Sequence, residues 1–147
     1  MGNSLKTGFT LIELLVVVAI IGMLLSVVIT AAQGSKAKSR DVRRANDVQQ
    51  VQNALELYRT NNQTYPSCAL LVINGSSDCL SSSLISEGAI SGLPLDPLNI
   101  GSGTCGVTQN YHVYCYESGD GLSYNLHYNL ETNNIPGKGK GWHKATP

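Results

Sequence analysis

The sequence predicts an α+β fold in which a long N-terminal helix packs on a small antiparallel β-sheet. Three observations support this class. A long apolar run near the N-terminus continues, with no proline before Pro66, into a segment with a helical stripe. A tyrosine-rich segment near the C-terminus then has the pattern of a β-hairpin.

Residues 9–32 form the apolar run, and Glu13 is its only ionisable side chain. As a helix these residues extend about 36 Å at 1.5 Å per residue, which is enough for the hydrocarbon core of a bilayer. The run is longer than the apolar core of a cleaved signal peptide, which has about 7–15 residues. We therefore expect a membrane-spanning helix here, because in lipid only a helix satisfies every backbone group within one segment.

Residues 33–62 are expected to continue the same helix as its amphipathic half. The apolar positions that form one helical stripe are Ala45, Val48, Val51, Ala54, Leu55 and Tyr58. Asn61 or Asn62 can take a left-handed cap, and Pro66 follows soon after. The sequence thus predicts one helix over about 9–62.

Residues 63–147 are expected to form a globular head. A short helical turn is predicted near Leu84, and "LPLDP" at 93–97 is predicted to be a proline-braced loop. Residues 111–116 and 122–130 read as the strands of a hairpin with its turn at 119–121, and a short edge strand is expected at Trp142.

Four cysteines lie in the head, at Cys68, Cys79, Cys105 and Cys115. Their spacing does not fit the short pairs of a zinc site, and an even number in a small domain favours disulfides in an oxidising compartment. Three pairings are possible. We favour Cys68–Cys79 and Cys105–Cys115, because short loops close more easily.

The segment "GFTLIELLVVVAIIG", from Gly8 to Gly22, resembles the N-terminal signature of type IV pilins and of the pseudopilins of type II secretion. In that family a membrane peptidase cuts after the glycine, and the new N-terminal residue is N-methylated. The resemblance implies a leader of residues 1–8, cleavage between Gly8 and Phe9, and methylation of Phe9. It also implies the pilin fold, with residues 9–32 forming the filament core.

Glu13 needs a physical explanation, because an ionised carboxylate at a helix centre in lipid costs about 2.5–3.5 kcal/mol. Cleavage would create a cationic amine at Phe9, in the same chain or in a neighbouring subunit, that can pair with it. The resemblance implies that this pairing helps assembly. The alternative is a tolerated carboxylate near the lipid headgroups.

A basic cluster follows the apolar run, and its members are Lys36, Lys38, Arg40, Arg43 and Arg44. By the positive-inside rule it would hold the C-terminal side in the cytoplasm, which conflicts with disulfides in the head. Pairing with Asp41 and Asp47 would soften that conflict. The cluster could contact DNA or lipid headgroups, but no aromatic residues interleave it to stack on bases, so we favour a solvated or subunit-contacting face.

No motif in the sequence indicates an enzyme, a cofactor or a metal site. The histidines His112, His127 and His143 have no metal-ligand spacing. Some pseudopilins bind calcium in an acidic loop, and "ESGDG" offers Glu117 and Asp120, but a hairpin turn explains these residues without a metal.

The sequence therefore predicts a type IV pilus subunit that polymerises with itself after processing by prepilin peptidase and delivery by inner-membrane assembly machinery. It would be a single-pass precursor in the cytoplasmic membrane and then an extracellular filament, serving adhesion, motility or DNA uptake; nucleic acid is not specifically indicated. The alternative is a pseudopilin in a periplasmic pseudopilus for protein export. A third reading is a secreted binding domain whose signal peptide is cut after Ala32.

Overall fold

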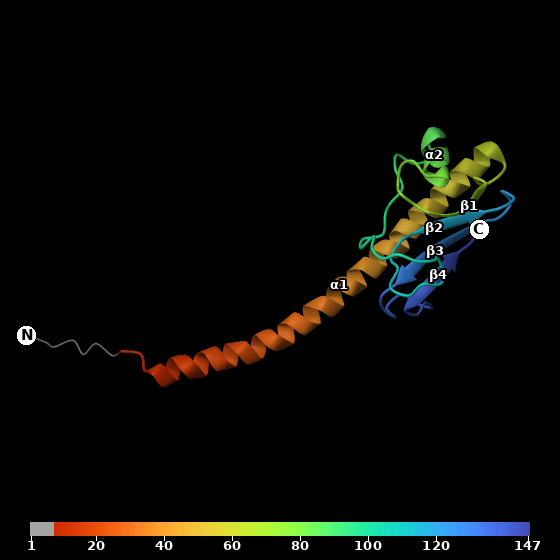
Figure 1. Ribbon diagram of the computed structural model, residues 1–147. Helices are drawn as coiled ribbons and strands as arrows, with labels where there is room; N and C mark the ends of the chain where they lie inside the picture. The colour runs from red at the N-terminus through yellow and green to blue at the C-terminus, as the bar shows by residue number, and fades with distance from the viewer. Residues whose placement is uncertain (1–7) are drawn as a thin grey trace, which may run out of the picture. The chain divides into compact units, whose positions relative to one another are not determined.

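The computed structural model describes residues 8–147, and the side chains of all of these except 27, 28 and 30–33. Most of the predicted leader lies outside these residues. The elements in chain order are α1 (Leu11–Asn62), β1 (Cys68–Val72), α2 (Cys79–Ser86), β2 (Cys115–Ser118), β3 (Asn125–Leu130) and β4 (Gly141–Ala145) (Figure 1). The chain divides into two units, one through Lys36 and one from Ala37 onward, and each is described by itself.

The first unit contains the N-terminal part of α1, whose described apolar side chains are exposed. Phe9 is 84% exposed, and the exposed side chains continue along the helix from Leu11 to Ile29. The backbone stays helical through this whole stretch, as the sequence predicts. In the part of the chain that the structure describes, no helix combines the length and the apolar character needed to cross a membrane.

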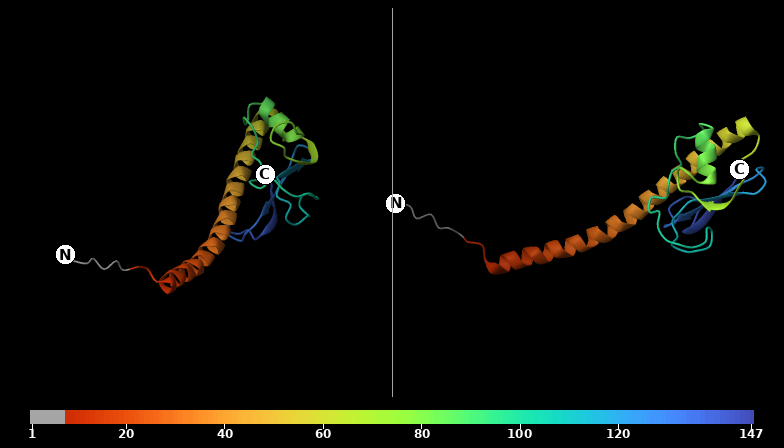
Figure 2. Two further views of the ribbon diagram at one scale, coloured as in Figure 1. Left: turned by 60° about the vertical axis from the view of Figure 1, so that its left-hand side comes forward. Right: turned by 45° about the horizontal axis from the view of Figure 1, so that its top comes forward.

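The second unit is built on a four-stranded antiparallel sheet in the order β1-β2-β3-β4. The C-terminal half of α1 lies along one face of this sheet, and the short helix α2 lies beside β1 (Figures 1 and 2). An antiparallel sheet with a helix on one face belongs to the α+β class, so the predicted fold class and its pilin-like arrangement are confirmed.

The predicted helical stripe forms the helix side of the hydrophobic core. Val48, Val51, Ala54 and Leu55 are buried, while the outer members of the stripe are half-buried. The sheet contributes its alternate residues to the same core, among them Leu126, Tyr128 and Leu130 of β3. The side chains that recur every 3.6 residues on the helix and every second residue on the strand therefore pack in one apolar layer.

The strands differ from the prediction in two places. Strand β1 was not expected; it has only five residues, and its pairing with β2 has an irregular register between Cys68 and Leu71. Residues 111–114 were expected to be strand but contain only an isolated bridge between Ile100 and His112. This segment instead crosses the sheet face away from α1, where Asn129 of β3 donates a hydrogen bond to the Tyr111 carbonyl at 3.2 Å.

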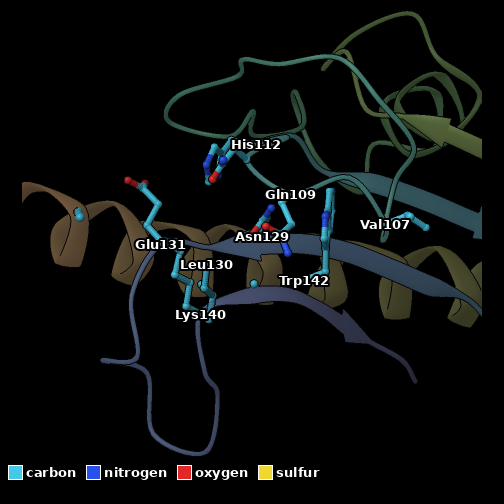
Figure 3. Close-up of a pocket in the computed structure, with 11 residues that line it drawn as sticks. Val107, Gln109, His112, Asn129, Leu130, Glu131, Lys140 and Trp142 are labelled. Atoms are coloured by element: carbon cyan, nitrogen blue, oxygen red, sulfur yellow. The ribbon is translucent and has the colours of Figure 1, made fainter.

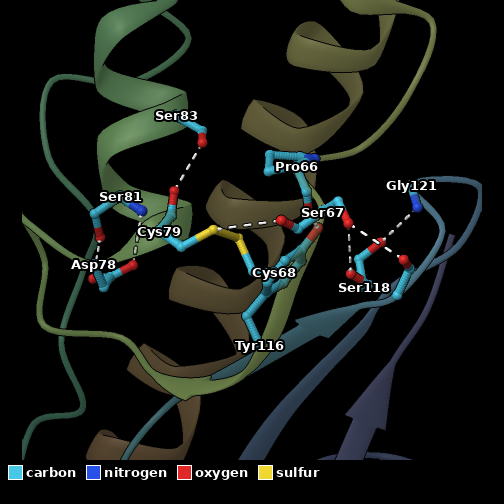
Figure 4. Close-up of a disulfide and its surroundings, with 11 residues drawn as sticks. Pro66, Ser67, Cys68, Asp78, Cys79, Ser81, Ser83, Tyr116, Ser118 and Gly121 are labelled. Carbon is cyan, nitrogen blue, oxygen red and sulfur yellow. Dashed lines mark hydrogen bonds between the residues drawn. A yellow bond between two sulfur atoms is a disulfide. The ribbon is translucent and has the colours of Figure 1, made fainter.

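Two disulfides close the head, and they join the pairs that the sequence favours. Cys68–Cys79 ties β1 to the first residue of α2, where Asp78 caps the helix by accepting from the Ser81 N–H at 2.8 Å (Figure 4). Cys105–Cys115 ties the loop before β2 to the first residue of that strand. Cys115 is fully buried, in a small second core that includes Tyr111 and Trp142.

Candidate assembly site

The N-terminal end of α1 is a capping box built from Thr10 and Glu13. Helix α1 begins at Leu11, so Thr10 precedes it as the cap. One Glu13 carboxylate oxygen, Oε2, accepts from the Thr10 backbone N–H and from the Thr10 hydroxyl, both at 2.8 Å. In return the Thr10 hydroxyl oxygen accepts from the Glu13 N–H at 3.3 Å. Such reciprocal bonds satisfy donors that a helix start leaves free.

The capping box leaves part of the Glu13 carboxylate unused. Within residues 8–147, the second oxygen, Oε1, accepts no hydrogen bond. Glu13 is exposed and lines a shallow hollow with Phe9 and the next turns of the helix. The site therefore presents a carboxylate oxygen beside the residue that cleavage after Gly8 would make N-terminal.

Sequence reasoning missed Thr10, although the signal was present. A Ser or Thr followed three positions later by Glu or Gln, just before an apolar run, is the pattern of a capping box, and "TLIE" has that pattern. Glu13 thus has a local structural role in addition to the predicted pairing with an amine.

The basic cluster is divided by the fold rather than presented as one face. Lys36, Lys38 and Arg43 are exposed, but Arg44 is fully buried and Arg40 is half-buried. The prediction of a solvated or subunit-contacting face is therefore wrong for Arg44. The reason is that Arg44 points into the head, where carboxylates from distant parts of the chain surround it.

Each of the five N–H groups of the Arg44 guanidinium has a partner. Nε and Nη2 donate to the two oxygens of Asp96 at 2.6 and 2.9 Å, and Nη1 donates to Asp41 at 2.8 Å and to Glu131 at 2.6 Å. The remaining Nη2 donor points to His112 Nδ1 at 3.5 Å. Burial alone would lower the pKa of Arg44, but the bonds to Asp96 and Glu131 outweigh it and raise that pKa.

The carboxylates of this network hold loops against α1. Asp96 belongs to the "LPLDP" loop, and Asp41 accepts from the N–H groups of Glu131 and Thr132 at 2.9 and 2.8 Å, just after β3. Arg40 also bonds Glu131 in a bidentate pair. Hydrogen bonds from Arg40 lower the pKa of Glu131 to about 2, against the opposing effect of burial. The network thus fixes the head to its helix.

The remaining polar candidates have local partners. Asp120 Oδ1 accepts from the N–H groups of Leu122 and Ser123 at 3.0 and 3.4 Å, which is the hairpin-turn alternative to a calcium ligand. Glu117 accepts from Asn125 at 2.8 Å, and His127 lies 3.4 Å from the same oxygen. Within residues 8–147, no group of three or more His, Cys, Asp or Glu side chains is placed to hold a metal ion.

His143 and His112 differ in environment. His143 lies on β4, with Nε2 2.6 Å from the Gly139 carbonyl, and its ring packs near Tyr128. His112 is buried beside Arg44, and burial and the guanidinium charge lower its pKa. His112 falls in the segment 111–116 that the sequence predicts as a strand, but it is buried and lies outside the strands.

The N-terminal region matches a known family model. Residues 3–29 match the model of the prokaryotic N-terminal methylation motif. The chain is also 36% identical over 96 residues to type II secretion system core protein G of Escherichia coli, covering 63% of this chain and 66% of that protein. The chain belongs to the pilin and pseudopilin family.

Other relatives in this family match over a shorter stretch. Type II secretion system core protein G of Vibrio cholerae is 40% identical over 62 residues, and that of Pseudomonas aeruginosa is 34% identical over 62 residues. These matches cover 42% of this chain and 42% and 44% of those proteins. The chain therefore spans less than two thirds of the length of these pseudopilin relatives. No solved structure matches it.

Proposed function

We propose that this pilin-family chain is the subunit of a type II secretion pseudopilus, a filament that polymerises through its N-terminal helices to export proteins. The observation that carries the proposal is the similarity to type II secretion system core protein G in several bacteria. This was the alternative, not the leading, interpretation of the sequence. We propose a structural role for the chain, and the capped helix and the ion-paired head of the described residues support it.

The exposed half of α1 supports polymerisation. A helix that exposes apolar side chains along its described length needs partners that cover them, and identical helices of other subunits supply such a surface. The membrane supplies it for the precursor. After prepilin peptidase cuts at Gly8 and methylates Phe9, the free Glu13 Oε1 can accept from the new amine of a neighbouring subunit.

The proposal is tested by separating the two roles of Glu13. Gln can replace Glu in a capping box, so Glu13→Gln keeps the helix cap and removes only the charge. Thr10→Ala weakens the helix cap and keeps the Glu13 charge. Ser26→Ala is a matched control, because it removes a hydroxyl of the same helix that donates to the Met23 carbonyl. We expect Glu13→Gln to abolish filaments and export while both other variants retain them. Equal loss of filaments and export in Glu13→Gln and Thr10→Ala would mean that Glu13 acts only as part of the helix cap.

The second candidate function is a type IV pilus subunit. The N-terminal methylation motif supports it equally, and the two disulfides are compatible with it, because disulfides persist outside the cell as they do in the periplasm. Deleting the gene separates the two candidates. A pseudopilus subunit is required for enzymes to appear in the medium, whereas a pilus subunit is required for surface fibres. Loss of fibres with unchanged export would overturn the pseudopilus proposal.

A further inference from the structure

A cavity of about 730 Å³ opens at the end of the sheet where β3 ends and β4 begins, and Ala37 of α1 is among the residues that line it (Figure 3). Residues of the 107–112 segment, the end of β3 and the start of β4 form its walls. They include Gln109, His112, Asn129, Lys140 and Trp142. In Figure 3, Gln109 and Asn129 lie near the centre of the view, with Trp142 to their right and His112 above and to their left. Neither proposed filament function uses this cavity.

Two buried side chains present unused polar atoms to the cavity. Asn129 is only 3% exposed, and its Nδ2 donates to Tyr111, which leaves Oδ1 without a partner among the described residues. Every fully enclosed side-chain nitrogen or oxygen in that part of the chain has a partner. Asn129 Oδ1 therefore reaches solvent, and it does so in the cavity that this residue lines.

His112 supplies the matching donor. It is 8% exposed, and its Nδ1 faces Arg44 Nη2, which can only donate. Nδ1 therefore accepts, and in the neutral ring the proton is on Nε2. By the same reasoning as for Asn129, this Nε2–H reaches the cavity, since it has no partner within residues 8–147. Asn129 and His112 line the same cavity, and Asn129 is bonded to the carbonyl of Tyr111, the residue before His112.

The rest of the cavity suits a hydroxyl-rich ligand with one apolar face. Gln109 and Asn110 add neutral amides, and each amide can both donate to and accept from hydroxyl groups. The Trp142 indole N–H donates to the Thr108 carbonyl at 2.8 Å, and the ring makes an edge contact with Tyr111. Trp142 therefore provides a fixed apolar surface. Exposed Val107 lies on the same rim.

We propose that this cavity binds an N-acetylated amino sugar unit of a glycan. The acetamido N–H would donate to Asn129 Oδ1, its carbonyl would accept from His112 Nε2, and its methyl group would pack on Trp142 and Val107. A peptide also carries amides, and one common mode of peptide recognition adds an extended peptide along a free strand edge. Of β4 only Gly141 and Trp142 line the cavity, so it does not follow that edge.

The test uses Trp142, the single tryptophan of the chain, as the reporter. The purified full chain is titrated with N-acetylglucosamine trimer, with cellotriose, and with N-acetyl-trialanine amide, and its tryptophan fluorescence is followed. We expect saturable binding of the acetylated trimer, at least tenfold weaker binding of cellotriose, and weaker binding still of the peptide. No response to the acetylated trimer, equal affinity for both sugars, or preference for the peptide would each overturn the proposal.

Two variants assign the binding to this cavity. Asn129→Leu removes the buried acceptor and should weaken binding at least tenfold, but it also removes a structural bond. Gln109→Ala changes an exposed rim residue and should weaken binding about fivefold without affecting the fold. Gln49→Ala is the matched control, because Gln49 is exposed on α1 and does not line this cavity. Wild-type affinity in Gln109→Ala, or equal weakening in Gln49→Ala, would contradict the assignment.

Discussion

Replacing Arg44 by lysine tests whether the buried network fixes the head to its helix. Lysine keeps the positive charge but offers three N–H donors in place of five, so at least two bonds to Asp41, Asp96, Glu131 or His112 are lost. Hydrogen bonds to charged groups contribute about 1.5–3 kcal/mol each, and breaking a buried pair costs about 3–5 kcal/mol. We expect Arg44→Lys to lower the free energy of unfolding by about 3 kcal/mol.

The neighbouring residue supplies the matched control for this prediction. The Arg43 side chain is 64% exposed and lies 3.8 Å from its acidic partner Asp47, so Arg43→Lys should change the free energy of unfolding by about 0.5 kcal/mol or less. Urea unfolding of both variants, followed by the fluorescence of Trp142, makes the comparison. If Arg44→Lys is as stable as Arg43→Lys, the buried network does not stabilise the head.

Three further predictions concern the head. The pKa of Glu131 is about 2 in the folded chain and near 4.5 in the unfolded chain. Glu131 therefore adds up to about 3 kcal/mol to the free energy of unfolding above pH 4.5, and this stabilisation is lost as the pH falls toward 2. The free energy of unfolding should therefore fall less steeply with decreasing pH in Glu131→Gln than in the wild type, and parallel curves of the two proteins would contradict this. Replacing Cys105 and Cys115 together by serine opens a loop of sequence separation 10 and should lower the free energy of unfolding by about 3 kcal/mol. An unchanged midpoint of urea unfolding would contradict this prediction. Asp78→Ala removes the cap of α2 and should lower the unfolding free energy by about 1 kcal/mol, against no change in an exposed Glu87→Gln control.

The parts of the fold that depend on local pattern could be predicted from the sequence. The stripe through Val48, Val51 and Leu55 has a helical period because those side chains meet one apolar layer. The hairpin between β2 and β3 follows from β-prone residues around a glycine-containing turn. Strand β1 could not be found in this way, because it is short and owes its place to pairing with β2 and to the disulfide at Cys68.

The ion network could not be predicted because its partners are distant in the sequence. Arg44 and Asp96 are 52 positions apart, and Asp41 and Thr132 are 91 apart, so no local period connects them. In the sequence the basic residues after the apolar run look alike, and only the fold separates buried Arg44 from exposed Arg43. The cavity acceptor at Asn129 was missed for the same reason, since its exposure depends on a segment that crosses the sheet.

Processing of the N-terminus is the central step of the proposed function, and the intact mass of the mature protein tests it directly. We expect loss of residues 1–8, one added methyl group, and four hydrogen atoms fewer than the reduced chain because of the two disulfides. A chain that begins at Phe9 with a methylated amine would provide the cation that the proposed pairing with Glu13 needs. A mass that corresponds to cleavage after Ala32, or to an uncut and unmethylated chain, would contradict processing as a pilin-family subunit.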